Sequence, residues 1–277
     1  AHTLPQFGIT TTFVDAHDLA ALEAAIRPNT RAVYLETLGH KLNAAGEIDL
    51  VALVGASMEG PVVARAALHY WEEPAISGTK GSGTVFFSGC VLRCVFCQNG
   101  SISRENYGKA VTAARLRETF EELIAQGAHN INLVSPTPYV PAIREALKGP
   151  LPVPVVWNSG GYEKPETIRM LDGYVDVYLP DFKYMESELA AAYSGAPDYP
   201  KYAKAALKEM LHQTGNIQID KDTGMIQKGV IVRHLVLPGH VKNSKAVIKY
   251  LLETYQDQIL ISIMNQYTPM PQVSGDP

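Results

Sequence analysis

Short apolar runs alternate with amphipathic stretches from about residue 83 to residue 264. Each apolar run is five to eight residues long and rich in Val and Ile. Runs of this kind are typical of parallel strands that are buried on both faces of a sheet. The segments predicted to be strands are residues 84–88, 130–135, 153–158, 175–180, 230–237 and 259–264.

The stretches between these runs carry apolar residues at helical spacing. They begin near Thr, Pro or Ser, and several end at Gly, as helices commonly do. The segments predicted to be helices are residues 111–126, 139–147, 165–171, 202–212 and 244–254. Strands that alternate with helices predict an α/β fold with a parallel sheet, which is either doubly wound or curled into a partial barrel.

The first 72 residues follow a different pattern. The strings FGITTTFVD and RAVYLET read as strands on either side of the helix DLAALEAAIR, which together predict an N-terminal βαβ-like extension. A second helix is predicted over residues 61–71. The Gly/Ser-rich stretch 76–83 then marks the boundary before the first strand of the repeat.

Polar residues and cysteines follow the predicted strands. The cysteines come directly after the first strand, and Asn158, Asp181 and His240 lie at or just beyond the ends of later ones. In βα-repeat folds the carboxyl ends of the strands carry the chemistry. The sequence therefore predicts a functional site at that edge of the sheet.

Charge and hydropathy exclude several classes of protein. Lys and Arg number 24 against 28 Asp and Glu, and the net charge of −4 argues against a nucleic-acid-binding arm or a membrane-surface patch. No apolar run reaches the roughly 18 residues that a membrane span needs. The start of the chain has no basic and then apolar leader, so we expect a cytoplasmic protein.

Three cysteines lie close together and none lies elsewhere. Cys90, Cys94 and Cys97 fall within eight residues, an odd and tightly spaced set that argues against a disulfide framework and for a metal or cluster site. Zinc would need a fourth ligand such as His69, His240 or a water molecule. An iron–sulfur cluster held by three thiolates would keep one iron open for a substrate. Both alternatives remain open on spacing alone.

The C-x3-C-x-aromatic-C spacing resembles that of radical S-adenosylmethionine (SAM) enzymes. The strings GSGTVFFSGCVLRCVFCQN, LHYWEEPAISG, GAHNINLVSPTPYV, NSGGYE, YLPDFKY, VRHLVLPG and MNQYTP are similar to those of the pyruvate formate-lyase activating enzyme-like group, over about residues 61–270. The resemblance implies a partial (β/α)6 TIM-type barrel of parallel strands. It also implies that the three cysteines ligate three irons of a [4Fe–4S] cluster, whose fourth iron is chelated by SAM.

The resemblance further implies an activity and its partners. A reduced cluster would cleave SAM to methionine and a 5′-deoxyadenosyl radical, which in the activating enzymes removes a hydrogen atom from a glycine of a glycyl-radical protein. The electron would come from a donor such as flavodoxin or ferredoxin. The alternatives are a non-catalytic iron–sulfur or zinc module and, judged by the N-terminal segment alone, a pyridoxal-phosphate enzyme.

Five further residues match the loops after the first three strands of the repeat. Phe96 matches an aromatic residue near the adenine of SAM, with a role as core filler as the alternative. Ser135 and Thr137 stand where relatives with Gly-Gly-Glu bind the amino group of SAM. Asn158 and Ser159 align with an Asp-Thr pair in a neighbourhood that holds a cation in better-known relatives, and Asn in place of Asp weakens that cation site.

Two charged residues align with an Asp-x-Lys motif after the fourth strand. Asp181 and Lys183 imply a site for the carboxylate of SAM, because a carboxylate in a dry site requires a cationic partner. A solvated surface lysine is the alternative for Lys183. Arg233 lies in an apolar strand, so we expect it to pair with the carboxylate of SAM or of Asp181. His234 points to the opposite face and is predicted to be structural.

Both ends of the chain depart from the family. The first 40 residues resemble a fragment of the pyridoxal-phosphate enzymes of Cys/Met metabolism, near O-acetylhomoserine sulfhydrylase, but lack the lysine and aspartate of that chemistry. We expect residues 1–60 to be an inert extension and residues 61–277 to form the barrel. Relatives continue beyond the sixth strand with a further helix, so the barrel is expected to be truncated and only marginally stable.

Overall fold

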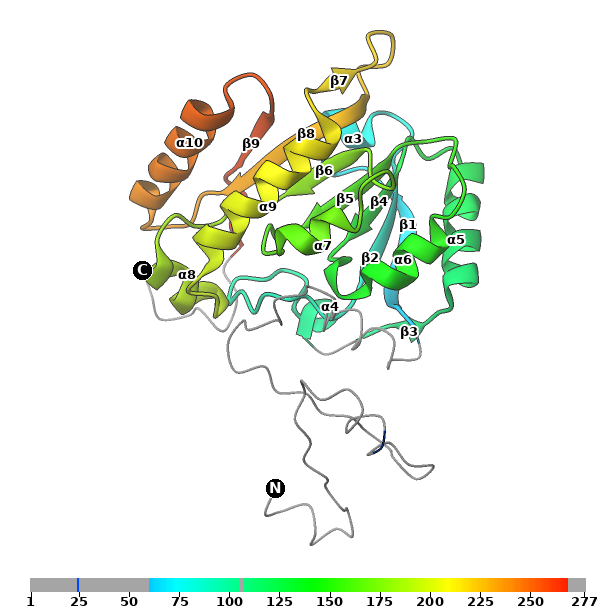
Figure 1. The fold of residues 1–277 in the computed structure, drawn as a ribbon, viewed down its shortest axis with the longest axis horizontal. Helices are drawn as coiled ribbons and strands as arrows, with labels where there is room; N and C mark the ends of the chain where they lie inside the picture. Colours follow the sequence, from blue (N-terminus) through cyan, green and yellow to red (C-terminus); the bar gives the residue numbers. More distant parts are fainter. Residues whose placement is uncertain (1–23, 25–59, 105–106, 269–277) are drawn as a thin grey trace, which may run out of the picture. The chain divides into compact units, whose positions relative to one another are not determined.

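A computed structural model describes residues 24, 60–104 and 107–268 of the chain (Figure 1). Apart from Ala24, all of these residues belong to one compact unit. They form an α/β fold around a nine-stranded sheet with the order β3-β1-β2-β4-β5-β6-β8-β7, in which β9 also pairs with β8. The edge strand β7 is short (Gln218–Ile219). The predicted βαβ-like extension lies outside the described residues.

Six of the strands are parallel neighbours, and they are the six that the apolar runs predicted. Each pairs in parallel with the next, which confirms the expected partial (β/α)6 arrangement. The Val and Ile side chains of the first five fit because both faces of these strands are covered, whereas Leu260 and Ile263 of the last are exposed. The strands are β2 (Ser82–Phe87), β4 (Ile131–Val134), β5 (Val155–Ser159), β6 (Val177–Pro180), β8 (Ile226–Leu235) and β9 (Leu260–Met264).

The five predicted helices are also present, and Figure 1 shows them in a row in front of the sheet, from α5 on the right to α10 on the left. Thr112 caps the first of them, since its side-chain oxygen accepts a hydrogen bond from the Arg115 amide. The helices are α5 (Ala113–Ala125), α6 (Val140–Ala146), α7 (Pro165–Arg169), α9 (Tyr199–Thr214) and α10 (Val241–Tyr255). Shorter helices are α3 (Pro74–Ser77), α4 (Gly100–Arg104), α8 (Ser187–Ser194) and the 3₁₀ turn η2 (Thr137–Tyr139).

The helix predicted over residues 61–71 is wrong, because this segment forms the strand β1 (Val62–His69). β1 runs antiparallel to β2, from Val63 opposite Phe87 to His69 opposite Ser82, and also pairs with β3 (Lys109–Ala110). Its alanines favour a helix by only a few tenths of a kcal/mol per residue. Ladder hydrogen bonds to the otherwise open edge of β2 outweigh that preference.

The sheet has two faces with different partners. Trp157, Tyr178 and Val230 point to the side of the helices, here called the helix face, and join the main core. Their strand neighbours Val156, Val177 and Ile231 belong to a second, smaller core on the opposite side, here called the inner face. The two cores alternate along the strands, as expected for strands covered on both sides.

The short helix α3 closes the inner face at the amino ends of the parallel strands. Its residue Ile76 is fully buried in the smaller core, together with Val156, Val177, Leu179, Ile226 and Ile231. The Ile76 carbonyl accepts a hydrogen bond of 2.7 Å from the Asn130 side chain, just before β4. The segment between β1 and β2 therefore covers the inner face at the amino ends of the parallel strands.

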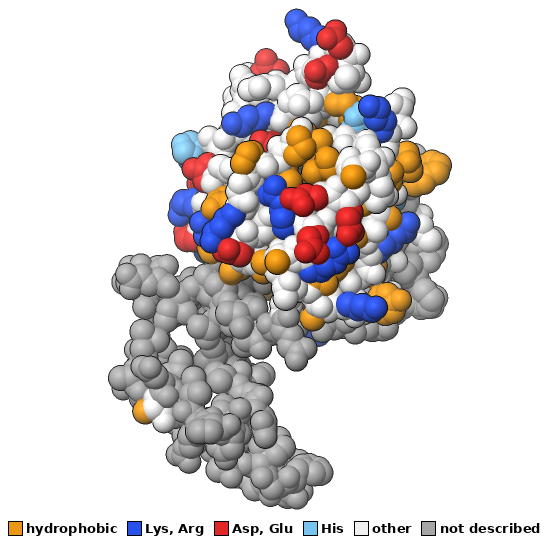
Figure 2. All heavy atoms as spheres, turned by 90° about the vertical axis from the view of Figure 1, so that its right-hand side faces the viewer, with side chains coloured by type: hydrophobic (Ala, Val, Ile, Leu, Met, Phe, Trp, Pro, Cys, Tyr) orange, Lys and Arg blue, Asp and Glu red, His pale blue; other side chains and the backbone are white. Residues whose placement is uncertain are grey.

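Charges of both signs are mixed on the exposed helices, as Figure 2 shows for the face that carries α5. Arg115 pairs with Glu118 at 3.1 Å and Glu122 at 2.7 Å, and Arg117 with Glu121 at 2.7 Å. Among the described residues, no helix is long and apolar enough to cross a membrane. That the chain has no nucleic-acid partner stays a prediction.

Candidate functional site

The three cysteines lie in the loop between β2 and α4, residues 88–99, here called the cysteine loop. Cys94 is buried, and Cys90 and Cys97 are half-buried. The loop rests on the end of α8, where the Val95 amide donates to the Tyr193 carbonyl at 2.9 Å. The Arg104 guanidinium donates to the Cys94 carbonyl. These contacts hold the thiols at the carboxyl end of β2, where the sequence placed the site.

The electrostatic surroundings of Cys90 include the other two cysteines. Burial raises the pKa of the Cys90 thiol, Cys94 and Cys97 raise it further, and Lys183 opposes them. Yet no group of three His, Cys, Asp or Glu side chains among the described residues could hold a single metal ion. Three thiolates would leave one iron of a [4Fe–4S] cluster without a protein ligand, whereas a structural zinc site takes four ligands.

The two histidines proposed as fourth zinc ligands are engaged elsewhere. The His240 ring nitrogen Nε2 lies 2.9 Å from the Tyr193 hydroxyl. The His69 ring packs edge-on against Phe86 with centroids 6.0 Å apart. A water molecule as the fourth zinc ligand stays an alternative.

A line of buried charges runs along the inner face toward the cysteine loop. Lys183 Nζ lies 2.5 Å from Asp181 Oδ2, and Arg233 Nε lies 3.0 Å from Asp181 Oδ1. The pairing of Arg233 with Asp181 confirms that prediction. The Lys183 side chain is only 15% exposed, so the alternative of a solvated surface lysine is wrong.

Glu72 completes this group, and sequence reasoning missed it. Its Oε2 lies 3.1 Å from Arg233 Nη1. Asn158 joins both residues, because its Oδ1 accepts from Arg233 Nη2 at 2.6 Å and its Nδ2 donates to Glu72 Oε1 at 3.3 Å. We call Glu72, Asp181, Lys183 and Arg233 the inner ion network. The signal for Glu72 was the acidic pair in the string LHYWEEPAISG.

Burial and charge act in opposite directions within the inner ion network. Burial alone would raise the pKa of the Asp181 carboxyl, but Lys183 and Arg233 outweigh it and lower that pKa below its ordinary value. For Glu72 burial prevails over Arg233, and the pKa is raised. Glu73 is near enough to Arg233 and Glu72 to influence both. Three carboxyl groups thus face two cations.

Two polar groups on the inner face have no hydrogen-bond partner among the described residues. They are the whole Asn132 carboxamide, which is fully buried, and Glu73 Oε2. Asn132 lies close enough to Glu72 to lower its pKa slightly, although the two make no hydrogen bond of normal geometry. Buried polar atoms of this kind are costly unless a ligand or water satisfies them.

Phe96 lies between the main core and the inner ion network. It is buried in the core, and its ring centroid is 6.0 Å from Lys183 Nζ, so the side chain is part of both. This distance is at the outer limit of a cation–π contact. Contact with adenine stays a prediction.

The other predicted contacts divide between the two faces. Ser135 ends β4 with a left-handed φ of 56°, a strained conformation typical of functional loops, and its amide donates to the Asn158 carbonyl at 2.9 Å. Thr137 instead donates to Glu163 Oε1 at 2.8 Å. Ser159, next to Asn158 on β5, faces the helix side with Glu163. The structure therefore brings Ser135 and Asn158 together, and it directs Thr137 and Ser159 away from them.

His234 is structural, as predicted. Both ring nitrogens are occupied, Nδ1 by the Phe182 carbonyl at 2.7 Å and Nε2 by the Ser244 hydroxyl at 2.9 Å. Since a carbonyl only accepts, Nδ1 carries the proton and Nε2 accepts from Ser244. Burial lowers the pKa of this imidazole.

Glu163 is a buried acid whose titration affects stability. It is 3% exposed, and burial raises its pKa above the ordinary value of 4.5. The folded state therefore holds this proton more tightly than the unfolded chain, and its contribution to stability is lost as the pH rises from 4.5 through the raised pKa. Glutamine does not titrate, so the free energy of unfolding of Glu163→Gln should increase relative to that of wild type as the pH rises through this window. The increase is at most about 1.4 kcal/mol per pH unit.

Urea unfolding at several pH values checks this expectation. Exposed Glu188→Gln is the matched control and should track wild type. A stability difference between Glu163→Gln and wild type that stays constant with pH would contradict the interpretation.

Tyr199 ties together the loops after β5 and β6. Its hydroxyl accepts from the Lys183 amide at 2.9 Å and lies 2.8 Å from the Asp181 carbonyl and 2.9 Å from that of Gly160. Gly161 beside it has a φ of 74°, and an added Cβ would lie 2.0 Å from the Asp181 carbonyl oxygen. The approach of these two loops therefore requires glycine at this position.

We expect Gly161→Ala to lower the free energy of unfolding by at least about 3 kcal/mol, because backbone must move to admit the methyl group. Gly173→Ala is the matched control, since Gly173 has a similar φ of 78° but nothing within 4 Å of the added Cβ. The free energy of unfolding of Gly173→Ala should fall only by the cost of a left-handed backbone at alanine, about 1–2 kcal/mol. Equal losses for the two variants in chemical unfolding would refute the steric argument.

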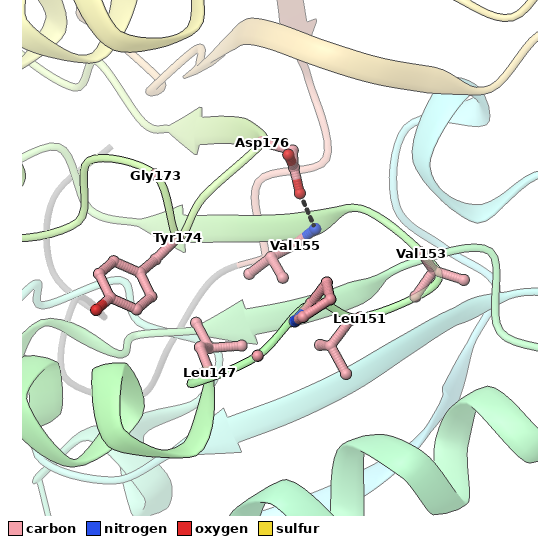
Figure 3. A pocket seen from close by; sticks show the side chains of 9 residues that line it. Leu147, Leu151, Val153, Val155, Gly173, Tyr174 and Asp176 are labelled. Atoms are coloured by element: carbon pink, nitrogen blue, oxygen red, sulfur yellow. Dashed lines mark hydrogen bonds between the residues drawn. The ribbon is translucent and has the colours of Figure 1, made fainter.

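A cavity of about 360 Å³ lies at the other end of the sheet, at the amino ends of β5 and β6 (Figure 3). It is lined largely by apolar side chains such as Leu147, Leu151 and Val153. Its one carboxylate, Asp176, accepts the Val155 amide at 2.9 Å and so completes the strand start. This cavity is separate from the cysteine loop, which lies at the carboxyl end of β2.

Comparison with protein families agrees with this geometry. The model of the radical SAM superfamily matches residues 84–251, which include the cysteine loop and all but Glu72 of the inner ion network. The model of Cys/Met metabolism PLP-dependent enzymes matches residues 1–64, where we noted the same likeness. This second match covers under a quarter of the chain and lies almost wholly outside the described residues.

One curated relative and several solved structures are similar. An uncharacterized protein of Methanocaldococcus jannaschii, MJ0674, is 32% identical over 211 residues, which are 73% of this chain and 57% of the relative. The chain thus spans little more than half of that protein. SuiB from Streptococcus suis is 14% identical with a TM-score of 0.45, over 68% of this chain and 40% of SuiB. HydG, a maturase of the [FeFe]-hydrogenase, is 16% identical with a TM-score of 0.43, over 66% and 42%. Likenesses this low say nothing about substrate.

Proposed function

Because the chain belongs to the radical SAM superfamily, whose members use a [4Fe–4S] cluster and SAM, we propose that Cys90, Cys94 and Cys97 hold that cluster and that the protein reductively cleaves SAM. The observation that carries the proposal is the set of three cysteines in one loop at the carboxyl end of β2, where Lys183 Nζ lies 6.0 Å from the ring of Phe96 in the same loop. When bound, the reduced cluster supplies the electron that splits SAM into methionine and a 5′-deoxyadenosyl radical.

The chain's own residues bind and orient SAM. Lys183 remains cationic, because Asp181 and Cys94 raise the pKa of its amine against the effect of burial. An ammonium group has three N–H donors, so Lys183 can bind Asp181 and also meet the carboxylate of SAM, as the Asp-x-Lys motif implied. Asn158 is neutral and already bound to Arg233 and Glu72, so the neighbourhood offers little to a further metal cation.

The unsatisfied groups on the inner face support a binding place for the substrate. The Asn132 carboxamide and Glu73 Oε2 would gain hydrogen bonds from a ligand that has both donor and acceptor atoms, as a peptide backbone has. The buried surroundings exclude water from a reactive radical.

The finer part of the proposal concerns the substrate and the partners. We propose that the radical removes a hydrogen atom from a glycine of a glycyl-radical protein, as in the pyruvate formate-lyase activating enzyme-like group. The electron comes from flavodoxin or ferredoxin in the cytoplasm. The motifs NSGGYE and YLPDFKY, which carry Asn158, Glu163, Asp181 and Lys183, support this assignment by their likeness to that group.

The test of SAM cleavage is anaerobic. The full chain is reconstituted with iron and sulfide, SAM and dithionite are added, and 5′-deoxyadenosine is quantified by mass spectrometry. We expect it to form only when cluster, SAM and reductant are all present. A reducible cluster without 5′-deoxyadenosine would identify a non-catalytic iron–sulfur module, and one bound zinc per chain a zinc module.

A labelling experiment tests the glycine. The reconstituted protein is incubated with cell extract in which glycine carries deuterium at the α-carbon. Transfer of deuterium into 5′-deoxyadenosine is expected if the radical acts on glycine. Product without deuterium would overturn the activating role and leave the SAM cleavage intact.

The N-terminal segment is proposed to be inert. Deletion of residues 1–45 is expected to leave the thermal unfolding of the remainder unchanged, and the full chain should show no internal-aldimine absorption with pyridoxal phosphate. Loss of folding on deletion would show that the segment supports the barrel.

A further inference from the structure

Ser194, at the end of α8, reaches the sulfur of Cys94. Its hydroxyl lies 3.0 Å from Cys94 Sγ, and both side chains are buried, at 2% and 8% exposure. The Ser194 carbonyl also accepts the Arg93 amide at 3.3 Å, so backbone and side chain of one residue both bind the cysteine loop. Gly195 ends the helix in the left-handed conformation, with a φ of 66°, which fixes this helix end against the loop.

A second hydroxyl, that of Tyr184, contacts Ser194. Tyr184 is fully buried, and its OH lies 2.7 Å from Ser194 Oγ. A serine hydroxyl has one hydrogen to donate, and a cysteine that ligates iron is a thiolate, which only accepts. Ser194 must then donate to Cys94 and accept from Tyr184. The phenol is protonated at neutral pH, and burial raises its pKa further.

We propose that Tyr184 and Ser194 form a directed hydrogen-bond relay onto Cys94 and are positioning residues that set how readily the cluster accepts its electron. The proposal rests on the proposed function only in that Cys94 ligates a cluster. Reduction adds negative charge to the cluster and its thiolates, and hydrogen bonds to the sulfurs stabilise that charge. The relay therefore favours the reduced state.

The contacts of the three cysteines are unequal, which provides an internal control. Cys97 Sγ has a hydroxyl neighbour, Ser103, but at 3.4 Å, and that hydroxyl also lies 3.4 Å from the Gly100 carbonyl. Ser103 is half-buried in α4. A shared and longer contact is weaker, so removal of this hydroxyl should have a smaller effect than removal of Ser194 Oγ.

The test is a redox titration of the anaerobically reconstituted full chain without SAM. Dithionite supplies one electron per cluster, and EPR measures the reduced fraction. For Ser194→Ala we expect the ratio of reduced to oxidised cluster at a given potential to fall about tenfold, which is 59 mV for a one-electron couple. For Tyr184→Phe this ratio should also fall, but by a smaller factor. For Ser194→Thr the ratio should stay near that of wild type, and Ser103→Ala should change it less than Ser194→Ala does.

Each outcome either supports or overturns the hydrogen-bond relay. An unchanged midpoint in both Ser194→Ala and Tyr184→Phe, or a change no larger than that of Ser103→Ala, would overturn the relay. A wild-type chain that binds no cluster overturns it as well. If Ser194→Ala fails to fold, Tyr184→Phe carries the test alone. A normal cluster that cleaves no SAM refutes the proposed function and leaves the relay standing, because the titration contains no SAM.

Discussion

Cys94→Ser is expected to lower 5′-deoxyadenosine formation at least about a hundredfold, because loss of a neighbouring contact alone can lower metal affinity or activity 10–100-fold and here a ligand itself is lost. Cys94 is the most buried of the three thiols, and it is held by Ser194, by Arg104 on its carbonyl and by the electrostatic influence of Lys183. Serine keeps the shape but offers a much harder, protonated ligand. Iron content, visible absorption and product yield are measured on the same preparation.

Val91→Ala is the control for this variant. Val91 lies in the same loop but is 40% exposed, so its truncation should leave iron content and product near wild type. Retention of both iron and activity in Cys94→Ser would mean that the cluster is held by other groups. The assignment of Cys94 as a ligand would then be wrong.

Arg233→Leu is expected to lower the free energy of unfolding by about 3–5 kcal/mol, the usual effect of removing one partner of a buried ion pair. The substitution leaves Glu72 and Asp181 without the guanidinium that both face, at 3.1 and 3.0 Å, and removes the bond to Asn158. The Arg233 side chain is only 15% exposed, so solvent screens these charges poorly. Urea unfolding at neutral pH measures the loss.

Arg115→Leu is the matched control on the surface. Arg115 also faces two glutamates, but its side chain is 47% exposed, so the loss should be much smaller than that of Arg233→Leu. In a double variant, Glu72→Gln removes one of the charges that Arg233→Leu leaves unpaired. The double variant should lose less stability than the sum of the two single variants. Strict additivity would show that Glu72 and Arg233 do not interact in solution.

The strands of the parallel sheet were predictable because their local pattern and their tertiary setting agree. Runs such as residues 153–158 are apolar on both faces, and β5 (Val155–Ser159) is covered on both faces. β1 was not predictable for the opposite reason. Its alanines favour a helix, and it is a strand because the edge of β2 needs a partner.

The candidate site was predictable where its residues sit in short motifs. Most site residues follow or occupy strands whose ends meet at one edge, so their proximity was predictable from the sequence. These residues are the three cysteines, Asp181, Lys183 and Arg233. Glu72 reaches Arg233 across 161 positions of sequence, and Ser194 reaches Cys94 across 100. Ser194 carries no local signal, because a hydroxyl at a helix end is common. The acidic pair that contains Glu72 is a weak signal, because acids in connecting segments are common too.

The helix α3 closes one end of the inner face to ligands. With Ile76 wedged among Val156, Val177 and Ile231, the base of the barrel is blocked to molecules that enter or leave. A ligand of the inner face would then enter from the opposite end of the strands, beside the cysteine loop.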